Sequence, residues 1–290
     1  MRPGEPSRTA EYMALFRALE TTRPPDRRLI EDHAAVRFLS PRLRVVAHAA
    51  RYAPLRPPIV AFIDRRWPGP RLSGVVRTRV IDDLVRSAIR DGCTQLVLLG
   101  AGYDTRATRL SEAKAIQAFE IDHPATQAHK RKTLGPTAAH VRYVPVDFEH
   151  DPLADALTDA GLDPSQRSCV VWEGVFSYLS TDAIDRTLAA LVQTCQPSSV
   201  VILTYIDQHV LDRSSSQPEP WIAAVRSVAE PFRTGLDPEH AGSFFAERSL
   251  TLCNDETTTE AAGRLGVTHP ETIPSFYHLA TLEVDEPPAG

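Results

Sequence analysis

The sequence is poor in the residues that build cysteine or histidine metal sites. Its four cysteines (Cys93, Cys169, Cys195 and Cys253) form no C-x-x-C pair. This spacing disfavours both a disulfide framework and a thiolate zinc site, and it fits a reducing, cytoplasmic setting. The ten histidines show neither H-x-x-x-H nor H-E-x-x-H spacing. We therefore expect no metal site.

Long apolar runs and an excess of basic charge are also missing. No apolar run approaches the roughly 18–20 residues that a bilayer-spanning helix needs, and the first residues lead into no apolar signal core. The net charge of −5 provides no broad basic surface for nucleic acid. We expect neither a membrane nor a nucleic-acid partner. The 290 residues, 42% apolar and 24% charged, are typical of a globular protein with one large α/β domain or two small ones.

The most informative stretch is an apolar run that leads into a glycine turn. Residues 95–99 read QLVLL, and Gly100-Ala101-Gly102 follows directly. This pattern predicts a buried parallel strand, a tight turn and then a helix. The two glycines allow unusual backbone dihedrals and the close approach of a ligand. In doubly wound folds, such a turn at the carboxyl end of a strand binds nucleotides.

Strands and helices alternate regularly after this turn. This alternation predicts an α/β fold with a doubly wound, Rossmann-like sheet. Two final strands are expected to pair as a hairpin on the sheet edge, which makes seven strands in all. The strands after the first are predicted at residues 115–121, 141–146, 168–172, 200–206, 250–254 and 277–284.

Two segments are added to this core, one before it and one within it. Residues 1–74 are predicted to form a helical cap that contributes to the substrate site, and residues 75–290 the core. An insertion after the fifth strand, residues 207–247, is predicted to form a lid or pocket wall, because long irregular segments are often functional. In the cap, helices are expected at residues 9–20, 30–39 and 43–52, followed by a proline-rich segment at 54–70.

Acidic residues recur where the strands end. Asp104 lies in the glycine turn, Asp147 follows the third strand, and Glu173 follows the fourth. Glu120 lies 20 positions after Gly100, at the end of the second strand, where an acid can accept both ribose hydroxyls of a nucleotide. A carboxylate at Asp147 can accept the adenine amino group. The set predicts a nucleoside-containing ligand.

The turn also discriminates between two such ligands. A dinucleotide fingerprint needs a third glycine, but Thr105 stands there. Asp104 would lie beside the diphosphate and repel it, whereas the sulfonium and ammonium groups of S-adenosylmethionine tolerate an acid. The residues therefore favour S-adenosylmethionine over a nicotinamide dinucleotide, and a nicotinamide oxidoreductase is the disfavoured alternative.

Five motifs together carry a resemblance to one family. They are LLGAGYDTR at 98–106, FEIDHP at 119–124, VPVD at 144–147, EGVFSYL at 173–179 and RTRVID at 77–82. With these motifs the chain resembles, over roughly residues 9–284, the leucine carboxyl methyltransferase-like group of class I S-adenosylmethionine-dependent methyltransferases. That group includes protein carboxyl methyltransferases and bacterial O-methyltransferases of secondary metabolites.

The resemblance implies a role for each matching position. The cofactor-binding residues would be Arg77 on the carboxylate, Gly100, Gly102 and Asp104 near the methionine part, Glu120 on the ribose, Asp147 and Phe148 around the adenine, and Glu173 near the amino-acid end. Tyr178 would lie near the methyl acceptor.

The implied activity is O-methylation of a small molecule, such as a bacterial polyketide or another secondary metabolite. A carboxylate acceptor is already ionised near neutral pH, so it needs no general base. A hydroxyl acceptor would benefit from one, and His209 or His240 are the candidates. The alternatives are a protein C-terminal carboxyl methyltransferase and a non-catalytic S-adenosylmethionine-binding protein. The sequence leaves the oligomeric state open.

Overall fold

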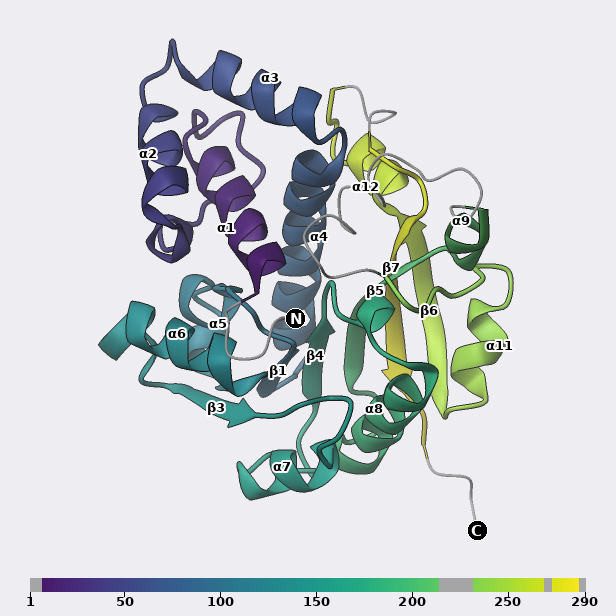
Figure 1. Ribbon diagram of the computed structural model, residues 1–290. Helices are drawn as coiled ribbons and strands as arrows, with labels where there is room; N and C mark the ends of the chain where they lie inside the picture. The colour runs from purple at the N-terminus through teal and green to yellow at the C-terminus, as the bar shows by residue number, and fades with distance from the viewer. Residues whose placement is uncertain (1–6, 214–231, 269–272, 287–290) are drawn as a thin grey trace.

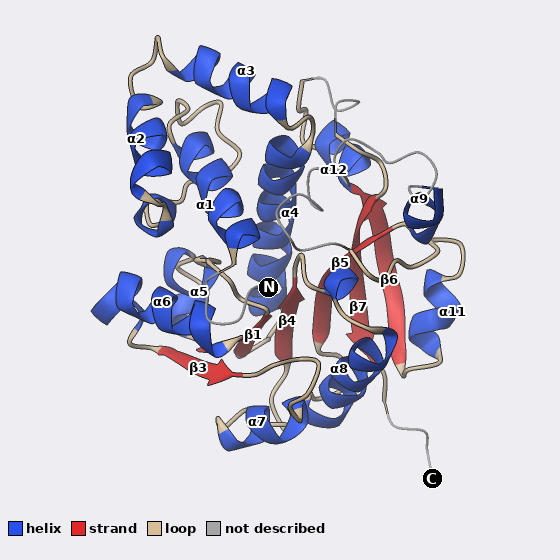
Figure 2. Cartoon of the chain, in the orientation of Figure 1, coloured by secondary structure: helices blue, strands red, loops and turns tan. Residues whose placement is uncertain are grey.

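A seven-stranded sheet forms the centre of the computed structural model, which describes residues 7–213, 232–268 and 273–286 (Figures 1 and 2). The strand order is β3-β2-β1-β4-β5-β7-β6. The first five strands are parallel, and β7 pairs antiparallel with both β5 and β6. The predicted doubly wound α/β fold is confirmed. The strands are β1 (Gln95–Leu99), β2 (Gln117–Asp122), β3 (Val141–Pro145), β4 (Ser168–Trp172), β5 (Val200–Ile206), β6 (Leu250–Thr257) and β7 (Tyr277–Val284).

The last two strands pair antiparallel at the sheet edge, as predicted. β7 is the inner strand of the two and lies between β5 and β6. Helix α12 (Thr258–Arg264) is part of the connection between them.

Side chains alternate between the two faces of the sheet, and each face is covered by helices. In β1, Leu96 and Leu98 join one apolar cluster, and Val97 and Leu99 join the other. The first cluster includes residues of α1 (Arg8–Thr21), α4 (Pro70–Arg90), α5 (Arg106–Arg109), α6 (Pro124–Leu134) and α12; the second includes residues of α7 (Leu153–Asp159), α8 (Thr181–Thr194) and α11 (Ala241–Ala246).

Within the described ranges, no helix is long and apolar enough to cross a bilayer.

The cap follows the prediction in part. Helices α1 and α2 (Pro41–Ala49) lie where helices were expected. The expected helix at 30–39 is only a 3₁₀ turn at Ala35–Phe38, and the Asp32 carboxylate accepts hydrogen bonds from the amides of Ala34 and Ala35 at its start. The proline-rich segment contains a helix, α3 (Arg56–Arg66), because its prolines fall in the first turn, where no amide donor is needed.

Cap and core share structure rather than meeting at a linker. Helix α4 runs unbroken past residue 74, and the side chains of α1 join the same apolar cluster as Leu96 and Leu98. A division into 1–74 and 75–290 stays a prediction. The predicted lid contains α9 (Gln208–Arg213) and α11, and its residues 214–231 lie outside the described part of the chain.

We predict that Gly100→Ala destabilises the ligand-free protein. Gly100 has φ +62°, and a Cβ there would lie 2.2 Å from the Cγ2 atom of Val175. Backbone strain and this overlap should together cost about 1–3 kcal/mol, measured by urea unfolding. The matched control is Gly263→Ala in α12, where an added Cβ meets nothing within 4 Å. That variant should be unchanged or up to about 1 kcal/mol more stable. Equal midpoints for the two variants would contradict the prediction.

Candidate active site

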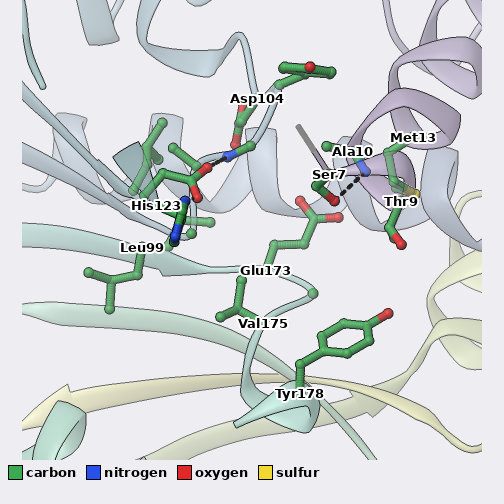
Figure 3. Close-up of a pocket in the computed structure, with 18 of the residues that line it drawn as sticks. Ser7, Thr9, Ala10, Met13, Leu99, Asp104, His123, Glu173, Val175 and Tyr178 are labelled. Carbon is green, nitrogen blue, oxygen red and sulfur yellow. Dashed lines mark hydrogen bonds between the residues drawn. The ribbon is translucent and has the colours of Figure 1, made fainter. Parts of the chain in front are cut away.

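A cavity of about 670 Å³ lies at the carboxyl ends of the central strands. It lies where the strand order reverses, between β1 and β4, which is where doubly wound sheets bind ligands. Its volume falls in the range of about 300–1,000 Å³ typical of small-molecule sites. Figure 3 shows Glu173 between Asp104 and His123 on one side and Met13 of α1 on the other. The cavity is therefore built by both the sheet and the cap.

The glycine turn forms the floor of this cavity. Gly100 and Gly102 both line it and both have positive φ, at +62° and +46°. The amide of Ala101 donates to the Ile121 carbonyl at 2.9 Å, and the amide of Gly102 donates to the Asp122 carboxylate. The turn is thus held against the end of β2, in a conformation that suits glycine.

The structure places the acid that was predicted to hold the ribose outside the cavity. Glu120 does not line the cavity: it is 1% exposed, and its Oε2 atom lies 2.7 Å from Nζ of Lys130. Asp122, two residues further along β2, does line the cavity. The strand ends at Asp122, one residue later than predicted. Both acids were visible in the motif FEIDHP, but the last acid of the strand is the one that reaches the edge of the sheet.

Arg77 and Glu173 meet inside the cavity wall. Nε of Arg77 lies 3.3 Å from Oε1 of Glu173, and its guanidinium lies over the Tyr277 ring at 4.2 Å from the centroid. All three residues line the cavity. The structure therefore brings together two predicted cofactor residues from α4 and the end of β4, and adds Tyr277 from β7.

Arg106 is the main residue that the sequence analysis missed. It is 2% exposed, and its guanidinium contacts Asp82 at 2.9 Å, Glu173 at 2.9 Å and the Asp104 carboxylate. Burial alone would raise the pKa of Asp104, but Arg106 beside it lowers the pKa to about 2. Asp104 lines the cavity as an ionised carboxylate, already bonded to Arg106.

Further buried ion pairs connect this centre to the cap. Arg17 of α1 contacts Asp32 at 2.9 Å and donates to the Tyr103 carbonyl in the turn. Burial would raise the pKa of Asp32, but Arg17 and Arg109 outweigh it and lower the pKa. We call the whole set the charge network: Arg17, Asp32, Arg77, Asp82, Asp104, Arg106, Arg109 and Glu173.

The loop after β3 closes the cavity on the side where adenine was predicted. Asp147 and Phe148 both line it. The Asp147 carboxylate accepts the Glu149 amide at 3.0 Å and lies 3.1 Å from Nδ1 of His150. These local bonds fix the turn, so Phe148 is held at the cavity wall.

Another part of the cavity wall is apolar. Tyr178 lies there, and its ring centroid lies 5.0 Å from that of Phe232. The cap contributes further apolar side chains, namely Tyr12, Met13, Phe16 and Trp67. This wall suits an apolar molecule bound beside a polar one.

The predicted general bases are not in the cavity. The His209 side chain is 57% exposed, and its Nδ1 atom lies 3.0 Å from Asp207. His240 is exposed as well and bonds to Asp237 at 2.7 Å. Neither lines the cavity, whereas His123 does. In the described ranges, no three or more His, Cys, Asp or Glu side chains are grouped to hold a metal ion.

We predict that Arg106→Met destabilises the fold by about 3–5 kcal/mol, because it leaves buried carboxylates without their partner. The change should be measured by urea unfolding at pH 7. The control is Arg264→Met, which removes an exposed pair with Glu256 and should cost less than about 1 kcal/mol.

The pH dependence provides a second readout of the same variant. With its folded pKa lowered from 3.8 to about 2, Asp104 contributes stability above pH 3.8 that is lost as the pH falls toward 2. Without Arg106 this contribution disappears, so the stability gap between the wild type and Arg106→Met should narrow from pH 5 to pH 3. A constant gap would contradict the assignment. If Arg106→Met does not fold, Asp104→Asn takes its place, because it removes the titrating carboxylate itself, and its stability gap to the wild type should narrow over the same pH range.

The chain is similar to known methyltransferases in sequence. A family model described as leucine carboxyl methyltransferase matches residues 10–192. A protein of Frankia alni assigned to the S-adenosyl-L-methionine-dependent methyltransferases is 33% identical over 227 residues, which cover 77% of this chain and 76% of the relative. A Streptomyces coelicolor protein with the same assignment is 33% identical over 228 residues, 77% of each chain.

Solved structures agree in fold. A Thermobifida fusca protein assigned to the methyltransferases superposes with a TM-score of 0.61 at 16% identity, covering 98% of this chain and 97% of the other. A Streptomyces avermitilis protein of the DUF574 family gives 0.55 at 14% identity, covering 92% and 96%. With the family model matching more than half of the sequence and relatives covering three quarters of it, the chain belongs to the leucine carboxyl methyltransferase family of S-adenosylmethionine-dependent methyltransferases.

Proposed function

We propose that this protein transfers a methyl group from S-adenosylmethionine to an oxygen of a small molecule, preferably a carboxylate. The observation that carries the proposal is that one cavity is lined by two kinds of residue: charged groups at the strand ends, here called the charged end, and apolar side chains around Tyr178 and from the cap, here called the apolar end. The charged end suits a cofactor with an amino acid and a ribose, and the apolar end suits an acceptor. The family's name, leucine carboxyl methyltransferase, supports the choice of oxygen.

The residues at the charged end fit the cofactor. The Arg77 guanidinium would hold its carboxylate, and Glu173 lies close enough to Arg77 to face the cofactor's ammonium group. Asp122 would accept the ribose hydroxyls. Asp147 and Phe148 would frame the adenine. The positive φ of Gly100 and Gly102 removes side chains from the floor, so backbone atoms can contact the ligand directly.

Methyl transfer requires the protein mainly to position the cofactor and the acceptor and to exclude water from the cavity. When bound, S-adenosylmethionine supplies a methyl group on a positively charged sulfur. An acceptor oxygen forms the new C–O bond as the S–C bond breaks, which yields S-adenosylhomocysteine and the methylated acceptor. The apolar wall excludes water and orients the acceptor for this in-line displacement. A carboxylate acceptor gives an ester with no proton released.

The pairing of two acids in the cavity favours a carboxylate acceptor. Arginines already engage both Asp104 and Glu173, which keeps these carboxylates from serving as a general base. A carboxylate needs no base near neutral pH, whereas a hydroxyl acceptor would lose a proton during transfer. Asp122 and His123 also line the cavity and are the candidates to accept that proton.

We predict that Asp122→Asn weakens S-adenosylhomocysteine binding by about tenfold or more, because a charge-assisted hydrogen bond is worth roughly 1.5–3 kcal/mol. Isothermal titration calorimetry measures the change. Asp159→Asn, an exposed acid on α7, is the matched control and should bind like the wild type. Unchanged affinity in Asp122→Asn would remove Asp122 from the site.

Tyr178→Phe should reduce turnover or raise the acceptor KM while leaving S-adenosylhomocysteine affinity within about twofold, because Tyr178 lies at the apolar end. Transfer of a labelled methyl group can be followed on paired aromatic acids and phenols, with a peptide ending in leucine as the protein-like acceptor. Base-labile methyl esters on the aromatic acids are the expected product. Transfer to the peptide alone would favour a protein substrate, and transfer to nitrogen or sulfur would contradict the proposal.

A further inference from the structure

A buried ion pair lies directly behind the glycine turn, outside the cavity. Lys130 of α6 and Glu120 of β2 are each 1% exposed, and their charged atoms lie 2.7 Å apart. Neither residue lines the cavity. Lysine and glutamate are almost never this buried unless they are paired. A buried pair is also weak evidence for stability, because desolvation offsets the attraction. The pair therefore calls for an explanation beyond stability.

The pair contacts the turn itself. Nζ of Lys130 lies 3.5 Å from the carbonyl oxygen of Ala101, the residue between the two glycines. The amide of Ala101 donates to the Ile121 carbonyl, and its carbonyl oxygen also accepts the Asp104 amide at 2.7 Å, so Lys130 adds a contact from α6 to a turn that is already bonded to β2. Gln127, one turn before Lys130, donates to the Glu120 carbonyl at 3.0 Å. A shift of Lys130 would therefore change the contacts of the cavity floor.

Lys130 is also the cation that acts on three acids. Besides Glu120, it lowers the pKa of Asp104 and that of Asp122, although burial leaves the pKa of Asp122 raised overall. Burial raises the pKa of Glu120 to about 7 despite Lys130, and Asp104 and Asp122 add to the increase. Two of these acids line the cavity, so Lys130 connects Glu120 electrostatically to the binding site.

The other charged and titratable groups near the pair come from neighbouring elements. Tyr143 of β3 is the register partner of Glu120, and burial, with Glu120 adding, raises the pKa of its hydroxyl. Arg131 of α6 lies over the Tyr143 ring, 5.4 Å from the centroid. His123 contributes to the field on Asp122. Of these groups, His123 is the other side chain whose ordinary pKa lies near that of the buried Glu120.

We propose that Lys130 and Glu120 are a positioning pair for the cofactor turn, and that protonation of Glu120 weakens cofactor binding. While Glu120 is ionised, it shares the Lys130 ammonium with Ala101. Once Glu120 is protonated, the ammonium is free to engage Asp122 and the turn more strongly. Asp122 is then a poorer acceptor for a ligand, and the site is less negative. The inference rests on the proposed use of S-adenosylmethionine.

The pair also changes how stability depends on pH. Because the folded pKa of Glu120 is raised, its favourable contribution is complete below its ordinary value of 4.5 and is lost as the pH rises through about 7. A positioning role adds an effect on ligand affinity over the same pH range. A purely structural pair would change stability alone.

The test measures S-adenosylhomocysteine binding by calorimetry from pH 6 to pH 8. Wild-type affinity should fall about threefold to tenfold toward pH 6. Glu120→Gln should remove this change and bind at pH 8 as weakly as the wild type does at pH 6. The residual slope of Glu120→Gln measures the contribution of His123. Glu247→Gln, at an acid whose side chain is 76% exposed, is the control and should keep the wild-type profile.

Lys130→Met provides a readout that needs no ligand. The amides of Ala101 and Gly102 should exchange with solvent at least about tenfold faster than in the wild type, while those of Val97 and Leu98 in β1 keep their protection. Lys132→Met, an exposed lysine on the same helix, should change neither set. The double variant Lys130→Met/Glu120→Gln should recover stability, because no buried carboxylate is left unpaired.

Three results would overturn the inference. One is an unchanged pH profile in Glu120→Gln together with unchanged amide exchange in Lys130→Met, which indicates a structural pair. Another is a loss of affinity in Glu120→Gln that disappears with 2′,3′-dideoxy-S-adenosylhomocysteine, because this indicates direct ribose binding. The third is faster exchange throughout β1. If the wild type binds no S-adenosylhomocysteine at any pH, the proposed function fails, and amide exchange still decides whether Lys130 positions the turn.

Discussion

The structure depends on how one buried arginine is neutralised. Arg106 follows the glycine turn at the start of α5 and contacts Asp82 of α4, Asp104 of the turn and Glu173 after β4. A buried guanidinium is tolerated only where its donors are satisfied, so these elements must come together at one place. Two of the cavity-lining carboxylates, Asp104 and Glu173, are therefore held by the same cation. The site's geometry follows from the packing of the fold's centre.

The same principle explains why the cap belongs to the site. Arg17 of α1 donates to the carbonyl of Tyr103, and the Phe38 ring stacks on the Tyr103 ring at 4.6 Å between centroids. The Asp32 carboxylate pairs with Arg17 and accepts a hydrogen bond from the Thr105 hydroxyl. The cap is thus bonded to the turn that forms the cavity floor, and it supplies the apolar wall at the same time. Ligand binding and cap docking share residues, which makes the cap a structural part of the pocket.

The features that depend on local sequence pattern, such as the buried strands and the glycine turn, could be predicted from the sequence. The direction in which a single side chain points could not. The apolar runs of β1, β4 and β5 and the positive-φ glycines were readable because burial and turn geometry leave a direct signature. Glu120 and Asp122 have the same chemistry two residues apart, and only the end of β2 decides which one reaches the cavity. Arg106 was visible in the motif, but its three partners lie up to 67 residues away in the chain. His209 and His240 were chosen by residue type, and nothing in the pattern showed that they pair with neighbouring acids on the surface.

The correction at Glu120 also changes how the acids around the turn should be understood. Four carboxylates, at Asp104, Glu120, Asp122 and Glu173, surround one strand end, and the buried cations Arg106, Lys130 and Arg77 are interleaved among them. Arg106 contacts Asp104 and Glu173, Arg77 contacts Glu173, and Lys130 contacts Glu120. Burial alone would raise the pKa of Asp104, and Arg106 instead lowers it to about 2, so this lining acid stays ionised. The cations behind the cavity are therefore as necessary to a ligand site as the acids that line it, because a buried acid keeps its charge only beside such a partner.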